Sequence, residues 1–453
     1  MSNRNHTEAS PPQQAPSSSL PKVIGMLVLI GIGIGIGAFW KFNQKEITPP
    51  PLVELKDVDP LIVSTIKAAE NRLHSDPHSA TAWGDLGITY WVNGFSEPGA
   101  YCLTQARTLE PKVGKWVYYD GLTYLPDDKE SAITRIKEAA DMLDSDSFAP
   151  RLRLANILSE DGRILEAEPY YRQVLEKRAD NPMAQLGLGH AANANGQPEE
   201  AIQYYERCAD HAYTRKAAHT ALASLYLRTN QPEKANASQK IVESIEMDEE
   251  WEDPYLTQVK PYRVGKTAWL DSVSNLVRRG RFKDALPLVK KIIQYYPDTT
   301  KAHIFLGNIY LSDKKYQEAE ASMREALKYD PEAVEALVQL GVSLFWQKRF
   351  DESIAMLKSA LIHSPELAEA QYNLGLGLAS TSKTSEAKEA FAKAIRSKPG
   401  LVDAYVGLAT LFLQDRQIEE AYKTLIKARE VSPNHPRVVS LLQQFERTPP
   451  KTP

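Results

Sequence analysis

The fold of this chain is decided by a short run, HIFLGNIY at His303–Tyr310, because variants of that run return along the sequence. The related runs are WGDLGITY at Trp83–Tyr90, LGH at Leu188–His190, LVQLG at Leu337–Gly341, YNLGLGL at Tyr372–Leu378 and YVGLA at Tyr405–Ala409. A small residue recurs in these runs every 34 positions over most of the chain, and a second helical pattern follows each run. This period predicts an all-α solenoid of helix-turn-helix units, each burying its apolar face only against its neighbours.

The phase of the units follows from two positions that must stay small where paired helices cross. The units are expected to start near Ala80, Lys112, Phe148, Pro182, Lys216, Lys266, Thr300, Val334, Ala368 and Val402. The small position on the first helix holds Gly87, Gly121, Ala155, Gly189, Ala223, Gly307, Gly341, Gly375 and Ala409, and only Val273 departs. The position on the second helix holds Ala167, Ala201, Ala235, Ala285, Ala319, Ser353, Ala387 and Ala421. A bulky side chain at either position would push the helices apart in a close-packed interior.

This pattern resembles the tetratricopeptide repeat family over residues 59–447. Prolines that end the second helices strengthen the resemblance: Pro111, Pro297, Pro331, Pro365, Pro399 and Pro433. The resemblance implies about ten antiparallel helix pairs stacked into a right-handed superhelix, with the first helices lining a concave groove. In this family such a groove binds peptides or protein segments, so we expect a non-catalytic interaction scaffold. The alternative is a structural subunit of a membrane or cell-envelope assembly or secretion complex that uses its outer surface.

The rest of the chain divides by composition around the repeats. We expect a Pro/Ser/Gln-rich tail at 1–21, a transmembrane helix at 22–41, a Pro-rich linker at 42–58, a first repeat block at 59–249, a connector at 250–265, a second block at 266–447 and a tail at 448–453. The first block is expected to open with a helix from Asp59 to about His74, since Asp59-Pro60 supplies a capping side chain and a first-turn proline. Arg437–Phe445 is expected to be a terminal capping helix.

Residues 23–40 are uncharged and lie between Lys22 and Lys41. A helix of that length spans about 27 Å, close to the hydrocarbon thickness of a bilayer. The alternative is a cleaved signal peptide, but no A-x-A-like cleavage site follows the apolar run. We therefore expect a single-pass anchor, with the N-terminus cytoplasmic and the repeats on the other side. Gly31 and Gly35 form a GxxxG pair that would allow a homodimer, although tolerance of glycine in this run explains the pair equally well.

The connector at 250–265 (EWEDPYLTQVKPYRVG) interrupts the 34-residue phase. Its aromatic residues Trp251, Tyr255 and Tyr262 lie among charges and two prolines, which is not a disordered composition. One interpretation is a packed connector that joins the two blocks and resets the repeat phase between them. The other is a segment that folds into the groove and regulates access to it.

Candidate groove residues follow from the resemblance, which places the binding surface on first-helix positions that face away from the partner helix. In the first block these are Arg153, Asn156, His190, Asn193, Ser224 and Arg228; in the second they are Ser274, Phe305, Asn308, Gln339, Trp346 and Asn373. Asn156, His190 and Ser224 share one phase and would form a polar ladder for an extended peptide backbone. They could equally be solvated positions without a ligand, and Trp346 could either anchor a ligand or pack between repeats. The lysine and asparagine set of carboxylate-clamp members is missing, which disfavours chaperone C-termini as ligands.

Composition, charge and missing motifs argue against several other classes of function. The net charge is −4 and gives no indication of nucleic-acid binding. Residues 52–265 carry 23 basic and 34 acidic side chains, whereas residues 266–447 carry 26 and 22, so the blocks could face different partners. Gly265-Lys266-Thr267 lacks the earlier glycine of a phosphate loop, and Cys102 and Cys208 have no metal-ligand companions. We expect no catalytic site, metal or cofactor.

Overall fold

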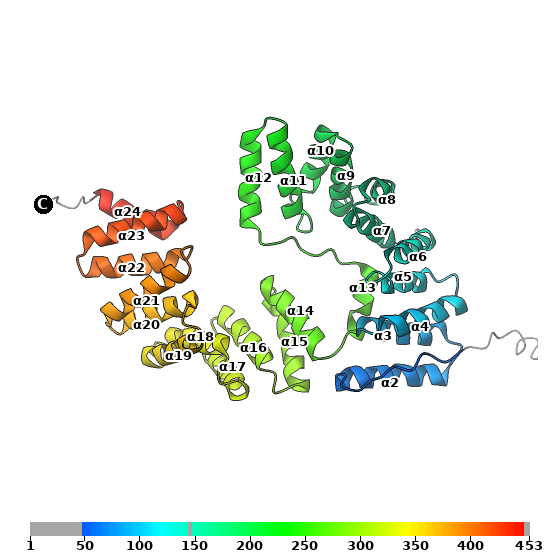
Figure 1. Ribbon diagram of the computed structural model, residues 1–453, viewed down its shortest axis with the longest axis horizontal. Helices are drawn as coiled ribbons and strands as arrows, with labels where there is room; N and C mark the ends of the chain where they lie inside the picture. Colours follow the sequence, from blue (N-terminus) through cyan, green and yellow to red (C-terminus); the bar gives the residue numbers. More distant parts are fainter. Residues whose placement is uncertain (1–47, 144–146, 448–453) are drawn as a thin grey trace, which may run out of the picture. The chain divides into compact units, whose positions relative to one another are not determined.

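The computed structural model describes residues 48–143 and 147–447. Over these ranges the chain forms 23 α-helices, one 3₁₀ helix and no strand (Figure 1). None of the helices in the described ranges is both long and apolar enough to cross a bilayer. The expected membrane helix at 22–41, the Gly31/Gly35 pair and the two tails at 1–21 and 448–453 lie outside the described residues.

Ten helix pairs make up most of the described chain. The first helices are α3 (Ala80–Val92), α5 (Gly114–Thr123), α7 (Ala149–Glu160), α9 (Pro182–Ala194), α11 (Arg215–Arg228), α14 (Lys266–Arg278), α16 (Thr300–Ser312), α18 (Val334–Trp346), α20 (Ala368–Ser380) and α22 (Val402–Gln414). The second helices are α4 (Ser96–Leu109), α6 (Lys129–Met142), α8 (Ile164–Lys177), α10 (Pro198–Cys208), α12 (Pro232–Ser244), α15 (Phe282–Tyr295), α17 (Tyr316–Tyr329), α19 (Phe350–His363), α21 (Thr384–Ser397) and α23 (Ile418–Val431). Every first helix begins within two residues of its expected start. The all-helical repeat fold is therefore confirmed.

Four further elements accompany the pairs: α2 (Pro60–Ser75), α13 (Pro254–Val259), the 3₁₀ helix η1 (Lys260–Tyr262) and α24 (Pro436–Arg447). The terminal helix α24 buries Val438 and Leu442 against the apolar core of α22 and α23. It covers the last repeat, as a capping helix should, because the outer face of that repeat has no further neighbour.

The chain divides into two compact units. Among the described residues, unit 1 consists of 48–56 and 64–262, and unit 2 of 57–63 and 263–447. The sequence placed residues 59–63 with the first block and 250–265 in a separate connector. In the structure residues 57–63 group with unit 2, and the connector belongs to unit 1 as far as Tyr262.

The physical reason for the first difference is the carboxylate of Asp59. It caps α2 by accepting from the backbone N of Leu61 (2.9 Å), and it also accepts from the backbone N of Lys266 (3.0 Å) and the Tyr296 hydroxyl (2.7 Å). Leu61 packs against the core around Trp269. Burial raises the pKa of Asp59, but these hydrogen bonds outweigh burial and hold it below its ordinary value.

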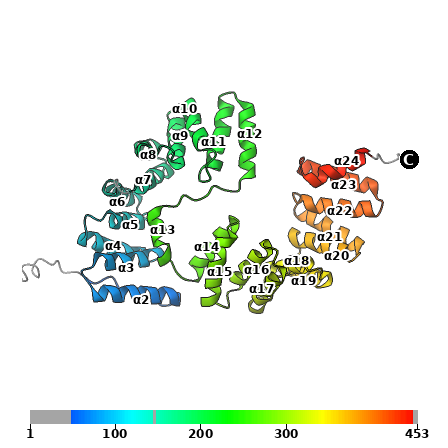
Figure 2. The same cartoon turned by 180° about the vertical axis from the view of Figure 1, so that it is seen from behind.

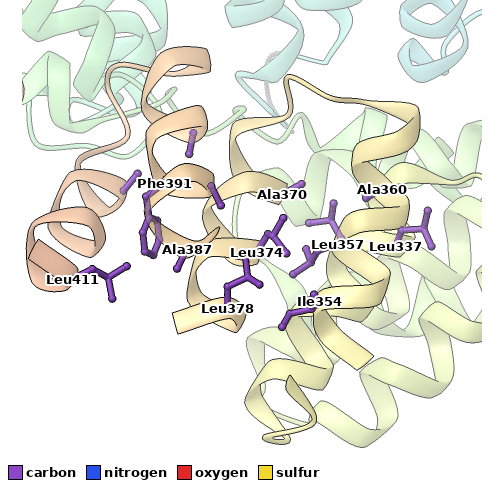
Figure 3. Close-up of a cluster of buried hydrophobic side chains, with 14 residues drawn as sticks. Leu337, Ile354, Leu357, Ala360, Ala370, Leu374, Leu378, Ala387, Phe391 and Leu411 are labelled. Carbon is purple, nitrogen blue, oxygen red and sulfur yellow. The ribbon is translucent and has the colours of Figure 1, made fainter. Parts of the chain in front are cut away.

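Each unit is held together by close approach at the small positions named above. All eight second-helix positions are buried, and at Ser353 the hydroxyl donates to the carbonyl of Gly341 (2.7 Å), so no polar group is left unpaired. Figure 3 shows the core from α18 to α22, where Phe391 lies beside Ala387. A Cβ added to Gly375 or to Gly407 would lie 2.7 or 2.8 Å from the Phe391 ring. The aromatic ring therefore fills the space left by glycines on two neighbouring first helices.

Candidate functional site

The twelve candidate groove residues all lie on first helices. Ser224, Arg228 and Trp346 are exposed, and eight others are half-buried: Arg153, Asn156, His190, Asn193, Ser274, Asn308, Gln339 and Asn373. Phe305 is only 8% exposed and belongs to the core around Val273 and Val289. Its place in the candidate set needs correction, because the ring of Phe305 closes the apolar core of its unit and is not presented to a ligand.

The expected polar ladder makes contacts within its own repeats. The Tyr171 hydroxyl donates to Oδ1 of Asn156 (2.9 Å), and the Tyr205 hydroxyl lies 2.7 Å from Nδ1 of His190. Both tyrosines are buried on second helices, and burial raises their pKa. Burial also lowers the pKa of His190, so the imidazole is neutral near pH 7. Asn156 and His190 therefore join the first and second helices of their own repeats. Ser224, the third member of the ladder, is exposed.

A second ladder, which sequence reasoning found only in part, lies one turn away. Asp85, Tyr119 and Arg153 are spaced by 34 residues on α3, α5 and α7. Only Arg153 was among the expected groove residues. Tyr119 and Asp85 lie one and two repeat periods before Arg153, so the sequence could have identified them, because equivalent repeat positions lie on the same face. We call these three residues the unit 1 ladder.

The connector lies on the unit 1 ladder. The Tyr262 hydroxyl donates to Oδ1 of Asp85 (2.8 Å), and the Tyr119 hydroxyl donates to the carbonyl of Tyr255 (3.0 Å). Arg153 forms an ion pair with Asp253 at 3.5 Å. Both views of the chain show α13 beside α3 and α5 (Figures 1 and 2). Residues of all three repeats thus contact one short segment.

Asp253 is the best-buried polar group of that segment. Its side chain is 2% exposed, accepts from the Tyr118 hydroxyl (2.5 Å), and caps α13 by accepting from the backbone N of Tyr255 (2.9 Å). Burial, reinforced by the charge of Asp253, raises the pKa of Tyr118, so the phenol remains a donor. Because Arg153 supplies the positive charge, the buried carboxylate is both paired and hydrogen-bonded, as stability requires.

Two aromatic contacts and a shallow cavity complete the arrangement. The ring of Tyr255 meets that of Tyr118 edge-on at 5.3 Å, and the guanidinium of Arg153 lies over the ring of Trp251 at 5.4 Å. Beside Tyr262, an open cavity of about 420 Å³ is lined by Ser64, Thr65, Ala68, Arg72, Thr89 and Pro261. The connector therefore already covers the first-helix side of α3, α5 and α7.

In unit 2 two of the three candidate amides bond to acids on the next first helix, whereas Asn373 donates to the backbone carbonyl of Glu369 in its own helix (2.9 Å). Nδ2 of Asn308 donates to Glu335 (3.1 Å), and Nε2 of Gln339 donates to Glu369 (3.3 Å). Glu335, Glu369 and Asp403 are themselves spaced by 34 residues, in the first turns of α18, α20 and α22. This acidic series does not stand out in the sequence, because single acids on exposed helix faces are common. The shared repeat position was the signal that could have found it.

Trp346 packs against the preceding repeat, which is one of its two expected roles, and the role of ligand anchor stays a prediction. The residue is 57% exposed, yet its ring stacks on Tyr316 of the preceding repeat at a centroid distance of 5.8 Å and an angle of 11°. With Lys314, Lys315, Gln317, Glu318 and Gln347, these two rings line an open cavity of about 500 Å³. A large aromatic face therefore stays accessible in unit 2, next to two lysines.

Comparison with known families supports the helix pattern. One tetratricopeptide repeat model matches residues 152–214 and 270–327, and a second matches 310–375 and 378–445. The chain is a tetratricopeptide-repeat protein. Ten of the twelve candidate residues lie within the matched repeats, and Ser224 and Arg228 lie outside them.

Solved structures of similar chains are shorter than this one. The crystal structure of MamA is 27% identical, with 36% of this chain and 94% of that chain covered and a TM-score of 0.33. YrrB, described as a tetratricopeptide-repeat protein with an unusual peptide-binding site, is 20% identical, with 42% and 98% covered and a TM-score of 0.35. The pilF protein of Pseudomonas aeruginosa is 22% identical, with 41% and 93% covered and a TM-score of 0.34. No curated protein sequence matches the chain.

Proposed function

We propose that this tetratricopeptide-repeat protein is a non-catalytic scaffold that binds segments of partner proteins on the first-helix faces of its repeats. The observation that carries the proposal is the regular spacing of polar side chains on those faces, above all Glu335, Glu369 and Asp403 in unit 2. A partner segment that crosses several repeats would meet the same kind of group once in each repeat. Such a series suits an extended chain, whose own polar groups also recur at a regular spacing.

A pull-down with the full chain tests this function. The face variant combines Gln339→Ala with Asn373→Ala and Trp346→Ala, and the matched control is Ile362→Ala, on the second helix α19. We expect the face variant to recover partners at least about tenfold less well, as expected for the loss of about 1.4 kcal/mol or more of binding energy. Equal recovery by the face variant and the unaltered chain would contradict binding on the first-helix face.

A specific observation favours the alternative of outer-surface assembly. Several large apolar side chains on second helices of unit 2 are exposed, among them Tyr295 (51%), Tyr329 (45%) and Ile362 (77%). These three side chains lie at the C-terminal ends of successive second helices, α15, α17 and α19, and contiguous exposed apolar patches often mark protein contacts. Under this alternative, Ile362→Ala together with Tyr329→Ala would lower partner recovery, and the face variant would not.

We further propose that residues 23–40 tether the scaffold to a membrane. The N-terminus would be cytoplasmic, the repeats would lie on the opposite side, and Gly31 with Gly35 would support a homodimer. Support comes from the sequence alone, namely an uncharged run long enough to cross the hydrocarbon core. A compartment-specific reporter fused after Pro453 tests the orientation, and activity of a cytoplasm-specific reporter would contradict it.

A further inference from the structure

Residues 251–262 cross the unit 1 ladder in the direction opposite to the order of the repeats. Asp253 meets Arg153 on α7, Tyr255 meets Tyr119 on α5, and Tyr262 meets Asp85 on α3. Each step back by one repeat thus uses the same position of the first helix. The figures place α13 beside α3 and α5 in the same unit (Figures 1 and 2). The segment thus contacts each of the three repeats through the same first-helix position, as a peptide bound along the repeats would.

The contacts recognise both the backbone and the side chains of the segment. The carbonyl of Tyr255 accepts from the Tyr119 hydroxyl (3.0 Å), and the carbonyl of Tyr262 accepts from Nδ2 of Asn93 (2.9 Å). Side-chain donors on the repeats therefore bind main-chain carbonyls of a short helical segment, which are present whatever its side chains are. Selectivity comes from the acid, which needs a phenol and a guanidinium, and from the aromatic rings on either side of it.

Little of the segment is built into the apolar core of the repeats. Only Asp253 and Val259 among residues 251–262 are buried, while the aromatic residues Trp251, Tyr255 and Tyr262 keep part of their surface in solvent. Separation of the segment would expose the unit 1 ladder and leave the helix pairs closed by their own second helices. The large buried residues Trp116, Leu152 and Ile136 belong to those pairs.

We propose that the first-helix face of α3, α5 and α7 binds a short helical segment in which an acid lies between aromatic residues, and that residues 251–262 are its built-in, displaceable occupant. This inference rests on the proposed scaffold function and adds the partner chemistry and the regulation of one face. A partner with an aspartate between aromatic residues competes with the chain's own segment. Because the tethered segment has an effective concentration in the millimolar range, it keeps weak competitors out.

The test uses a fluorescent peptide of residues 249–264 and the full chain. In the disarmed chain, Asp253→Ala and Tyr262→Ala weaken the built-in segment while Asp85, Tyr119 and Arg153 stay in place. We expect the peptide to bind the disarmed chain at least about tenfold more tightly than the unaltered chain, measured by fluorescence anisotropy, because its competitor is removed. Equal affinity for the two chains, or binding to neither, would overturn the proposal.

Two controls separate recognition from nonspecific binding. A peptide with Asp253→Ala, or a disarmed chain that also carries Arg153→Ala, should lose at least about tenfold in affinity, since the buried ion pair cannot form. A peptide with Glu252→Ala should bind like the parent, because Glu252 is exposed and pairs only with Lys260 of the same segment. Equal loss for the Glu252 and Asp253 peptides would overturn the assignment of the acid.

A further measurement keeps the proposal testable if the disarmed chain is poorly folded. Hydrogen exchange of the unaltered chain should show faster exchange for the amides of 254–262 than for those of α5 and α7, because the segment opens without the repeats. Identical protection, or loss of helical circular dichroism in the disarmed chain, would make the segment a fixed part of the fold and overturn the proposal. The pull-down with the unit 2 face variant is independent of these outcomes, so failure here leaves the scaffold function standing.

Discussion

The two units use the same first-helix positions differently. In unit 1, Asp85, Tyr119 and Arg153 bind a segment of their own chain, and Asp253 is buried in the contact. In unit 2, Gln339 at the equivalent position donates to Glu369 on the next first helix and remains half-buried, whereas Asn373 donates to the backbone carbonyl of Glu369 in its own helix. The repeat fold fixes where these side chains lie, but it does not fix what they bind. A position on this face can hold an internal contact in one repeat and be available to a partner in another.

Phe391→Ala tests whether unit 2 is stabilised by its apolar core, and it is expected to have the largest effect on stability. Removing the ring that fills the space beside Gly375 and Gly407 leaves a large cavity. We expect a loss of about 3–5 kcal/mol in the free energy of unfolding, measured by urea denaturation with a probe in unit 2. Phe391→Leu is the control and should cost much less. A loss below about 1 kcal/mol would show that unit 2 does not depend on this packing.

Asp253→Ala tests the internal contact of unit 1. It leaves the Tyr118 hydroxyl and the Arg153 guanidinium without their acceptor. We expect a loss of about 1–3 kcal/mol, seen in unit 1 and not in unit 2. Glu252→Ala, which removes an exposed acid one residue away, should change stability by no more than about 0.5 kcal/mol. If both variants cost the same, the buried carboxylate is not the centre of the contact.

The turns between paired helices differ from repeat to repeat within both units. A residue in the left-handed region recurs there, and it is glycine at Gly162 and Gly196 in unit 1 and at Gly280 in unit 2, but Asn230 in unit 1 and Lys314 and Lys348 in unit 2. A side chain is strained in this conformation, so Lys314→Gly and Lys348→Gly should each raise the free energy of unfolding by about 0.5–1 kcal/mol. Gly162→Ala should lower it by at least as much. Thermal unfolding measures all three, and a destabilising Lys348→Gly would contradict the assignment of strain.

Protonation of His190 is expected to have the smallest effect, and it should be confined to unit 1. Burial holds the pKa of His190 below its ordinary value of 6.5. The unfolded chain therefore takes up this proton first, and the stability contributed by the neutral imidazole is present above pH 6.5 and lost as the pH falls toward the folded pKa. Lowering the pH from about 7.5 to about 5.5 should reduce the Tm of unit 1, and less so in His190→Gln. An equal reduction in both chains would assign the effect to other groups.

Much of the fold could be predicted because its determinants are local and repeated. The small positions at Gly375 and Ala387, for example, have equivalents in nearly every repeat, and helix starts follow from them within two residues. The candidate site was less accessible. Phe305 shares the repeat position of Gln339 and Asn373, yet its ring turns into the core, because a phenyl group gains more from burial than an amide does.

The sequence by itself determined the helix pairs, their phase and the terminal cap, because a 34-residue period records contacts between neighbours along the chain. Only the tertiary structure decided that Tyr262 bonds to Asp85, 177 residues away, and that Tyr296 bonds to Asp59 across 237 residues. Such contacts leave no periodic signal, since each occurs once and joins a segment outside the repeat pattern to a face within it. Their formation depends on the shape and charge of a surface that exists only after the repeats have stacked.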